Sequence, residues 1–211
     1  VETGWSTLDP LFTPSDEKNI GRKTILLCST FSKKLSCAPH LFDEVKRLSE
    51  TGQWRWLIQF HPKMDKKIVE KYQSIQSENL TFVETDDVIP LLKSADVMVC
   101  DTSSVLIMFL LQNKPVVTFK NISPTNCLID IDDVKHLESA ICQALEKQPE
   151  LMKSIQGFID KIHPYHDGKS AVRVLDAIDF SLKNIANRKR KRFDLVRQFK
   201  MRKKLNYWKF W

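Results

Sequence analysis

The sequence predicts an α/β fold built on a parallel sheet, and three observations lead to this prediction. Short, continuous apolar runs recur along the chain, segments with helical spacing of apolar residues separate them, and hydroxyl or charged residues follow the runs. Continuous apolar runs suit strands that are buried on both faces of a parallel sheet. Strands alternating with helices favour βαβ units, so we expect a Rossmann-like sheet with helices on both faces.

The predicted elements follow one another from residue 23 onward. Strands are expected at Thr24–Cys28, Trp56–Phe60, Leu80–Val83, Val97–Cys100 and Pro115–Phe119. The helices between them are expected at Ala38–Ser49, Asp65–Gln76, Val88–Ser94 and Ser104–Leu111. A loop and a short apolar stretch come next, at Lys120–Asn126 and Leu128–Ile131, and helices are expected at Val134–Glu146, Glu150–Ile162 and Lys169–Asn187. We therefore divide the chain into a leading segment (1–22), a Rossmann-like domain (23–187) and a C-terminal tail (188–211).

Charge is unevenly distributed over the 211 residues, whose net charge is +7. The tail holds eleven Lys and Arg and one Asp, about +10, so residues 1–187 carry about −3. No apolar run approaches the roughly 18–20 residues that span a bilayer. The five cysteines form no Cys-x-x-Cys pair, which we interpret as free thiols in a reducing compartment. The chain starts at Val1 without a secretory signal, and we interpret it as a piece of a longer protein.

Two short motifs stand at the ends of predicted strands. Phe60–Lys63 reads Phe-His-Pro-Lys, and Asp101–Ser104 reads Asp-Thr-Ser-Ser and opens directly into a helix. Ligands of open α/β sheets bind outside the carboxyl ends of the strands. Hydroxyl groups at a helix start can bind a phosphate, and a histidine can bind one or protonate a leaving group. The two motifs together indicate a site for an anionic phosphate donor, although Ser and Thr are also ordinary helix caps.

Two further strand ends carry polar residues. Ser29–Lys34 follows the first predicted strand, and its hydroxyl groups and lysines would face the same crevice. Glu84–Asp87 follows the third, where backbone groups could touch a nucleotide base, although helix capping is the simpler interpretation. His163 and His166 have a spacing that could bind a metal, but no third ligand is apparent in the sequence. We therefore expect neither a metal nor a cofactor.

Several motifs are missing from the sequence, and their absence narrows the function. There is no Gly-x-Gly-x-x-Gly after any predicted strand, so a nicotinamide dinucleotide site is not expected. Neither a phosphate-binding loop of the Gly-x-x-x-x-Gly-Lys type nor a Gly-x-Ser-x-Gly nucleophile motif is present. The helix after Ser104 has no acidic residue to hold a ribose, which argues against the usual UDP-sugar glycosyltransferase or epimerase.

From about Thr3 to Ile178, the chain resembles the C-terminal half of the CDP-glycerol glycerophosphotransferase family, GT-B enzymes of teichoic-acid and related cell-surface polymer synthesis. The matching stretches are Gly4–Phe12, Phe60–Lys63, Leu91–Ser104, Asn113–Val117 and Asp167–Ser170 with Arg173. The His-Pro and Ser-Ser pair is also similar to bacterial sialyltransferases and Kdo transferases, which use CMP donors. The resemblance thus implies a cytidine-nucleotide donor more strongly than any particular transferred group.

The resemblance also implies roles for individual residues. His61 would be catalytic, contacting the donor phosphates or assisting departure of the nucleotide. Thr102, Ser103 and Ser104 would hold the phosphates, and Thr30 would occupy the position of the family's Pro-Thr-x-Arg loop. Two departures stand out: that loop here lacks the arginine, although lysines follow closely, and Met108 stands where the family usually has an acidic residue.

The tail, residues 188–211, mixes Lys and Arg with Phe, Tyr and Trp. This composition suits the anionic surface of a membrane, where each basic residue contributes about 1 kcal/mol. Binding of RNA or DNA is the rival interpretation, since basic and aromatic side chains also grip phosphates and stack on bases. A disordered tail without a partner is the third.

These observations predict a transferase that moves glycerol-phosphate, or a related group, from a CDP- or CMP-linked donor to a cell-surface glycan or lipid-linked acceptor. The chain would supply the donor-binding half, residues 23–187, while the N-terminal half that binds the acceptor is missing. We expect the protein in the cytoplasm, on the inner face of the cell membrane. The alternatives are a non-catalytic fragment that binds a membrane or nucleic acid through its tail, and a CMP-sugar glycosyltransferase.

Overall fold

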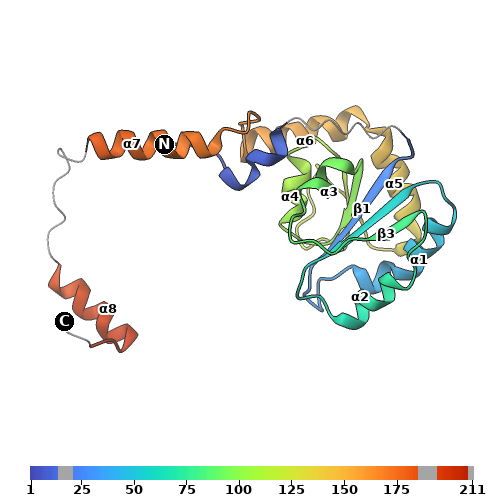
Figure 1. Cartoon of the computed structure of the whole chain (residues 1–211), viewed down its shortest axis with the longest axis horizontal. Coiled ribbons are helices and arrows are strands. Elements are labelled where there is room, and N and C mark those ends of the chain that lie inside the picture. Colours follow the sequence, from blue (N-terminus) through green and yellow to red (C-terminus); the bar gives the residue numbers. More distant parts are fainter. Residues whose placement is uncertain (14–20, 185–193, 209–211) are drawn as a thin grey trace. The chain divides into compact units, whose positions relative to one another are not determined.

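A computed structural model of the chain describes residues 1–13, 21–184 and 194–208. By its internal contacts the chain divides into two compact units, Val1–Arg173 and Val174–Trp211. The first holds a sheet of six strands in the order β3-β2-β1-β4-β5-β6, with every neighbouring pair parallel (Figure 1). The strands are β1 (Thr24–Ser29), β2 (Arg55–Phe60), β3 (Leu80–Phe82), β4 (Val97–Cys100), β5 (Val116–Phe119) and β6 (Ile129–Ile131). The predicted Rossmann-like parallel sheet is confirmed.

Alternate residues of the strands face two separate cores. Ile25, Leu27 and Val99 point to one side of the sheet, which α1 (Ala38–Glu50), α2 (Lys66–Gln73) and α5 (Leu137–Glu146) cover. Leu26 and Met98 point to the other side, which α3 (Ile89–Ser94), α4 (Val105–Leu110) and α6 (Pro149–Ile162) cover. Figure 1 shows this division of the helices. Because both faces are buried, the strands read as continuous apolar runs.

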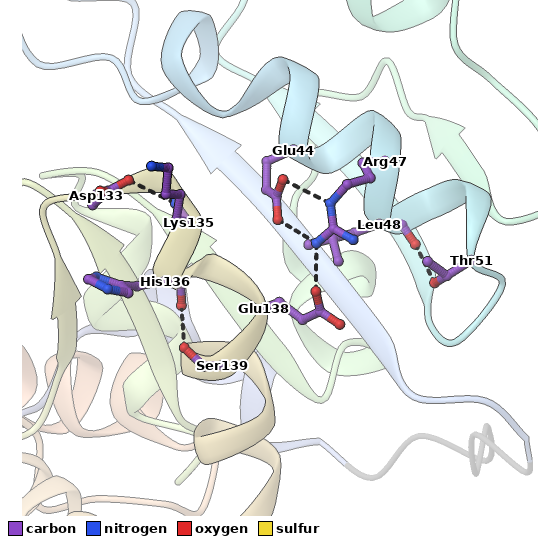
Figure 2. Close-up of polar contacts among 9 residues, drawn as sticks. All are labelled: Glu44, Arg47, Leu48, Thr51, Asp133, Lys135, His136, Glu138 and Ser139. Carbon is purple, nitrogen blue, oxygen red and sulfur yellow. Dashed lines mark hydrogen bonds and ion pairs between the residues drawn. The ribbon is translucent and has the colours of Figure 1, made fainter.

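The two helices α1 and α5 are joined on the surface by one arginine. The guanidinium of Arg47 donates to Glu44 on its own helix at 2.6 Å and to Glu138 of α5 at 2.5 Å (Figure 2). These two carboxylates raise the pKa of Arg47 above its ordinary value. The guanidinium therefore stays charged at any ordinary pH, and salt weakens this surface contact by screening it.

Three segments differ from the prediction. The leading segment contains a 3₁₀ helix, η1 (Ser6–Phe12), whose Leu8 and Leu11 join the second core. The helix predicted from Val134 is divided into a 3₁₀ turn, η2 (Val134–His136), and α5, because Asp133 caps the turn by accepting the Lys135 N–H. The apolar stretch after the loop pairs with β5 as a sixth strand, β6, which the sequence did not predict.

The last two helices are α7 (Ser170–Lys183) and α8 (Leu195–Leu205). Asp9 fixes the start of α7, because its carboxylate accepts the N–H groups of Ser170 and Ala171 at 2.9 and 2.8 Å. The prediction of a helix up to Asn187 extends beyond Asn184, and the residues that follow, 185–193, lie outside the described residues. The predicted domain limits at 22/23 and 187/188 stay predictions.

Candidate functional site

The two central strands of the sheet create the crevice in which the candidate site lies. From β1 the chain runs outward through β2 to β3, then returns to β4 on the other side of β1 and continues through β5 to β6. The loops that follow β1 and β4 therefore leave the sheet in opposite directions. In open parallel sheets this switch point leaves a crevice at the carboxyl edge, where ligands bind. Ser29 ends β1 and Cys100 ends β4, so the loop that starts at Thr30 and the Asp101–Ser104 motif both open at this point.

A pocket of about 470 Å³ occupies this crevice. All five residues predicted to act on the donor line it: Thr30, His61, Thr102, Ser103 and Ser104. The rest of its lining is Cys28, Ser29, Phe31, Gln59, Pro62, Thr85, Asp86, Val88 and Val105. The structure thus brings together groups from the ends of β1, β2, β3 and β4. Lys33 and Lys34, expected near this crevice, are exposed and are not among the described residues that line it.

Two residues of the lining, Ser29 and Thr30, which we call the floor of the pocket, depend on the carboxylate of Asp101. The Asp101 side chain is fully buried behind them. It accepts the hydroxyl of Ser29 at 2.6 Å and the backbone N–H of Thr30 at 3.0 Å. It also accepts the backbone N–H of Cys37 at 3.0 Å, and the Ser29 hydroxyl lies 2.8 Å from that of Ser36. Sequence analysis assigned Asp101 no role. In the structure it joins the end of β4 to the loop after β1 and to the start of α1.

The rim of the pocket is exposed and carries His61. Its Nδ1 accepts the backbone N–H of Lys63 at 3.1 Å, so the neutral ring holds its proton on Nε2. The ring of Phe31 packs against the imidazole with centroids 4.6 Å apart, and the Lys63 ammonium lies 5.7 Å from the same ring. The sequence analysis assigned Phe31, a loop residue, no role in the site. Its place directly after the β1 end, beside a His-Pro motif, is the signal that could have found it.

The three hydroxyl groups before α4 differ in what they already contact. Thr102 Oγ1 accepts the backbone N–H of Ile122 at 3.1 Å, which ties this loop to the one after β5. Ser103 Oγ accepts the N–H of Val105 at a long 3.4 Å. Ser104 occupies the cap position of α4 and makes no side-chain capping bond. Ser103 and Ser104 are thus the two whose hydroxyl groups are less committed to the fold.

A second hollow, of about 460 Å³, adjoins the first. Both are lined by His61, Pro62, Thr85 and Asp86, and the second adds Phe60, Val69, Phe82, Val83 and Glu84. It lies where the sequence predicted backbone contact with a nucleotide base, at the end of β3. The Glu84 carboxylate accepts the side-chain amide N–H of Gln73 on α2, and Thr85 Oγ1 accepts the Asp87 N–H within the loop, so both contacts hold this loop in place.

Charge and thiol chemistry limit what the pocket can do. Among the described residues that line it, Asp86 is the one carboxylate and no lysine or arginine is present. Burial, with the Asp101 carboxylate, raises the pKa of the Cys28 thiol to about 12, so this cysteine stays protonated and is a poor nucleophile. The arrangement offers hydroxyl groups, backbone N–H groups and an imidazole as hydrogen-bond donors. Such donors suit a negatively charged ligand.

Histidines outside the pocket have structural contacts. His163 Nε2 accepts the backbone N–H of Trp5 at 3.0 Å, and its ring stacks on Phe12. Within the described ranges, no three His, Cys, Asp or Glu side chains gather as a metal site would require. None of the described helices has the length and apolarity needed to cross a bilayer.

The fold and the crevice define the class: this is one Rossmann-like half of a GT-B arrangement. Residues 21–122 match the family CDP-Glycerol:Poly(glycerophosphate) glycerophosphotransferase, which confirms the resemblance over this part of the chain. The matched residues include the loops that carry His61 and Ser103. Among curated protein sequences, none matches the chain significantly.

Solved structures of the same fold are numerous. The S. aureus MnaA–UDP structure is 17% identical, covers 91% of this chain and 56% of its own, and has a TM-score of 0.58. The wall teichoic acid polymerase TagF soaked with CDPG is 16% identical, with 82% and 43% covered and a TM-score of 0.57. A UDP-N-acetylglucosamine 2-epimerase is 15% identical, with 92% and 53% covered and a TM-score of 0.57. The chain spans about half the length of these proteins, and at such identities the likeness concerns the fold alone.

Proposed function

We propose that this chain supplies the donor-binding half of a transferase. The enzyme moves glycerol-phosphate, or a related group, from a CDP- or CMP-linked donor to a cell-surface glycan or lipid-linked acceptor. One observation carries the proposal: groups from four strand ends, all selected from the sequence, line one pocket at the switch point of the sheet. The family match over the same loops supports it.

In this proposal the donor phosphates lie between the rim and the loop before α4. His61 presents its Nε2 proton to a phosphate oxygen, because Nδ1 is occupied by the Lys63 N–H. Ser103 and Ser104 donate their hydroxyl protons from the opposite side of the pocket. Thr102, already bonded to Ile122, and Thr30, whose N–H is held by Asp101, position the loops that surround the phosphates.

The nucleoside of the donor occupies the adjoining hollow at the end of β3. Phe60, Phe82 and Val69 give this hollow an apolar wall, which suits the face of a base. Val83–Asp86 also line the hollow, and in this proposal their backbone groups contact the edge of the base. His61 and Pro62 line both hollows, so a single nucleotide spans them with its phosphates beside the imidazole.

The reaction is a displacement at phosphorus when the donor is CDP-glycerol. A hydroxyl oxygen of the acceptor forms the new bond to the phosphorus of the glycerol-phosphate group, and the bond from that phosphorus to the bridging oxygen breaks. CMP leaves with the electron pair, and the acceptor hydroxyl loses its proton to solvent. Negative charge grows on the departing phosphate, where His61 and the serine hydroxyl groups stabilise it. A second domain, outside these residues, binds the acceptor in this proposal.

The proposal includes a cytoplasmic location. Four of the five cysteines are buried and all five are free thiols, which supports a reducing compartment.

Calorimetric titration of the chain with CMP, CDP, UDP and CDP-glycerol tests the proposal. We expect cytidine nucleotides to bind more tightly than UDP, and the double variant His61→Ala, Ser103→Ala to lose most of that affinity. The matched control is His136→Ala, Ser139→Ala, which removes the same two side chains from an exposed surface far from the pocket in sequence. Equal losses in both variants, or no binding of any cytidine nucleotide, would contradict the proposal.

The titration also separates the alternatives. Tighter binding of UDP would favour a relative of the UDP-sugar epimerases, although α4 and its cap residue, Ser104–Leu110, carry no carboxylate for a ribose. Binding of CMP with indifference to the glycerol group would favour a CMP-sugar glycosyltransferase.

A further inference from the structure

The second unit of the chain contains a short helix with its own caps. Helix α8 starts at Asp194, whose carboxylate accepts the Arg197 N–H at 2.9 Å. It ends at Asn206, which adopts the left-handed conformation with φ of 50°. The Tyr207 N–H then donates to the Arg202 carbonyl at 3.0 Å, which satisfies a carbonyl of the last turn. The helix is therefore defined at both ends, although no buried core supports it.

Positive charge is concentrated on this helix. Its basic residues are Arg197, Lys200, Arg202, Lys203 and Lys204, and no acidic residue lies between its first and last positions. Arg197, Lys200 and Lys204 follow the i, i+3, i+7 spacing, so they form one stripe. They line a shallow hollow together with Val196, Met201 and the cap residue Asp194, which places exposed apolar atoms beside three cations and one carboxylate.

Apolar side chains of α8 are exposed as well. Leu195 is 67% exposed, Val196 65% and Phe199 58%. The left-handed turn at Asn206 brings the chain back, so that the Trp208 ring meets that of Phe199 edge to face, with centroids 5.5 Å apart. Helix α8 thus presents an aromatic pair and aliphatic side chains next to a basic stripe.

We propose that α8, with Tyr207 and Trp208, docks on the surface of an anionic lipid bilayer. Lys and Arg side chains beside exposed aromatic and aliphatic groups suit the boundary between headgroups and acyl chains. The basic stripe complements the negative surface of phosphatidylglycerol-type lipids, while Phe199, Trp208 and Leu195 insert below the headgroups. This docking is independent of the proposed donor site.

Two comparisons favour a bilayer over a nucleic acid. RNA bases stack on aromatic rings and RNA phosphates contact basic groups, but RNA has no apolar region to bury aliphatic side chains such as Leu195, Val196 and Leu205. Helix α7 also exposes apolar residues, with Leu175 62% and Ile178 48% exposed. However, its Arg173 and Lys183 are matched by Asp176 and Asp179, so it lacks the net positive charge of α8. Because α8 carries a net positive charge and α7 does not, α8 is the helix that suits an anionic surface.

Sedimentation of the full chain with lipid vesicles tests this inference. We expect binding to phosphatidylcholine vesicles that contain phosphatidylglycerol, weak binding to phosphatidylcholine alone, and loss of binding at high salt. The triple variant Arg197→Gln, Lys200→Gln, Lys204→Gln is expected to lower the partition coefficient on the order of a hundredfold. The matched control, Lys66→Gln, Lys153→Gln, Lys161→Gln, removes three exposed charges from the sheet domain and should leave it within about twofold.

A second pair of variants tests the apolar contribution. Phe199→Ala with Trp208→Ala should weaken binding to anionic vesicles about tenfold at low salt, where the wild-type chain binds. Leu175→Ala with Ile178→Ala on α7 is its control and should change little. The inference is overturned if neutral and anionic vesicles bind equally, if the two triple variants lose equally, or if RNA binds and displaces the chain from vesicles.

Discussion

The floor and the rim of the candidate pocket are built in opposite ways. Behind the floor, the buried Asp101 carboxylate accepts a hydroxyl and backbone N–H groups from two other segments. On the rim, the exposed His61 has one nitrogen bonded to the Lys63 N–H, while its other nitrogen makes none of the hydrogen bonds found among the described residues. A polar group whose hydrogen bonds are all made within the protein stabilises the fold, whereas a group with a free donor or acceptor can bind a ligand. A carboxylate at a sheet edge is therefore no sign of catalysis until its partners are known.

The largest expected effect comes from breaking the floor. Asp101→Ala leaves the N–H groups of the half-buried Thr30 and the buried Cys37 without an acceptor, and each such group costs about 1–3 kcal/mol. We expect the free energy of unfolding to fall by roughly 3–4 kcal/mol, measured by urea denaturation. Asp101→Asn retains one acceptor oxygen and should fall between wild type and Asp101→Ala. A loss below about 1 kcal/mol for the alanine variant would show that the network is not structural.

The rim variant should behave in the reverse manner. His61→Ala removes an exposed side chain, so the free energy of unfolding should change by less than about 0.5 kcal/mol. The affinity for a cytidine nucleotide should fall about tenfold, because a hydrogen bond to a phosphate is lost. Calorimetry and denaturation of the same preparation measure both quantities. If the variant unfolds more easily but binds normally, the distinction between floor and rim is wrong.

Ser103 gives a finer test within the rim. Its hydroxyl accepts only a long bond from the Val105 N–H, so Ser103→Ala should leave stability almost unchanged. We expect a loss of donor affinity of about tenfold, the effect of one hydrogen bond to a charged phosphate oxygen, in the same titration. Thr102→Val is the comparison, since it removes the acceptor for the Ile122 N–H and should cost stability as well. Identical behaviour of the two variants would refute the distinction.

The smallest effect expected at neutral pH concerns a half-buried amino group outside the pocket. Lys114 donates to the carbonyls of Leu92 and Lys93 at 2.9 and 2.6 Å, and burial lowers its pKa from 10.5 to about 8, with Asp96 partly opposing this shift. The unfolded chain binds this proton more tightly, so the contribution of Lys114 to stability rises between pH 8 and 10.5. We expect Lys114→Met to match wild type near pH 7.5 and to fall behind it near pH 10. Denaturation at both pH values checks this, and a constant difference between them would contradict the lowered pKa.

Much of the fold followed from apolar pattern, whereas the floor of the site did not. Strands β1, β2, β4 and β5 are continuous apolar runs, and their burial on both faces explains why the pattern revealed them. The partner segments of Asp101 lie 64 to 72 residues away in the chain, so local sequence could not reveal them. Strand β6 has only three residues and one buried side chain, too weak a signal for a strand.

Which residues gather at the pocket was predicted more fully than what each one does. His61, Thr30, Thr102, Ser103 and Ser104 all line it, because strand ends in a parallel sheet meet at one edge. The bond from the Ile122 N–H to Thr102 and the packing of Phe31 on His61 depend on loop conformations that the pattern does not encode. Their roles toward a donor stay predictions.

The pairing of β1 with β4 has a consequence for how the chain folds. Ile25 pairs with Val97, and the Ser29–Asp101 bond spans 72 residues, so the centre of the sheet closes through distant contacts. Such contacts form late, because a long loop must be ordered before they contribute. Until β4 arrives, β1 presents an unpaired apolar edge that can recruit the edge of another chain. The pocket is thus among the last features to form, and a ligand that fills it should draw aggregation-prone intermediates toward the native state.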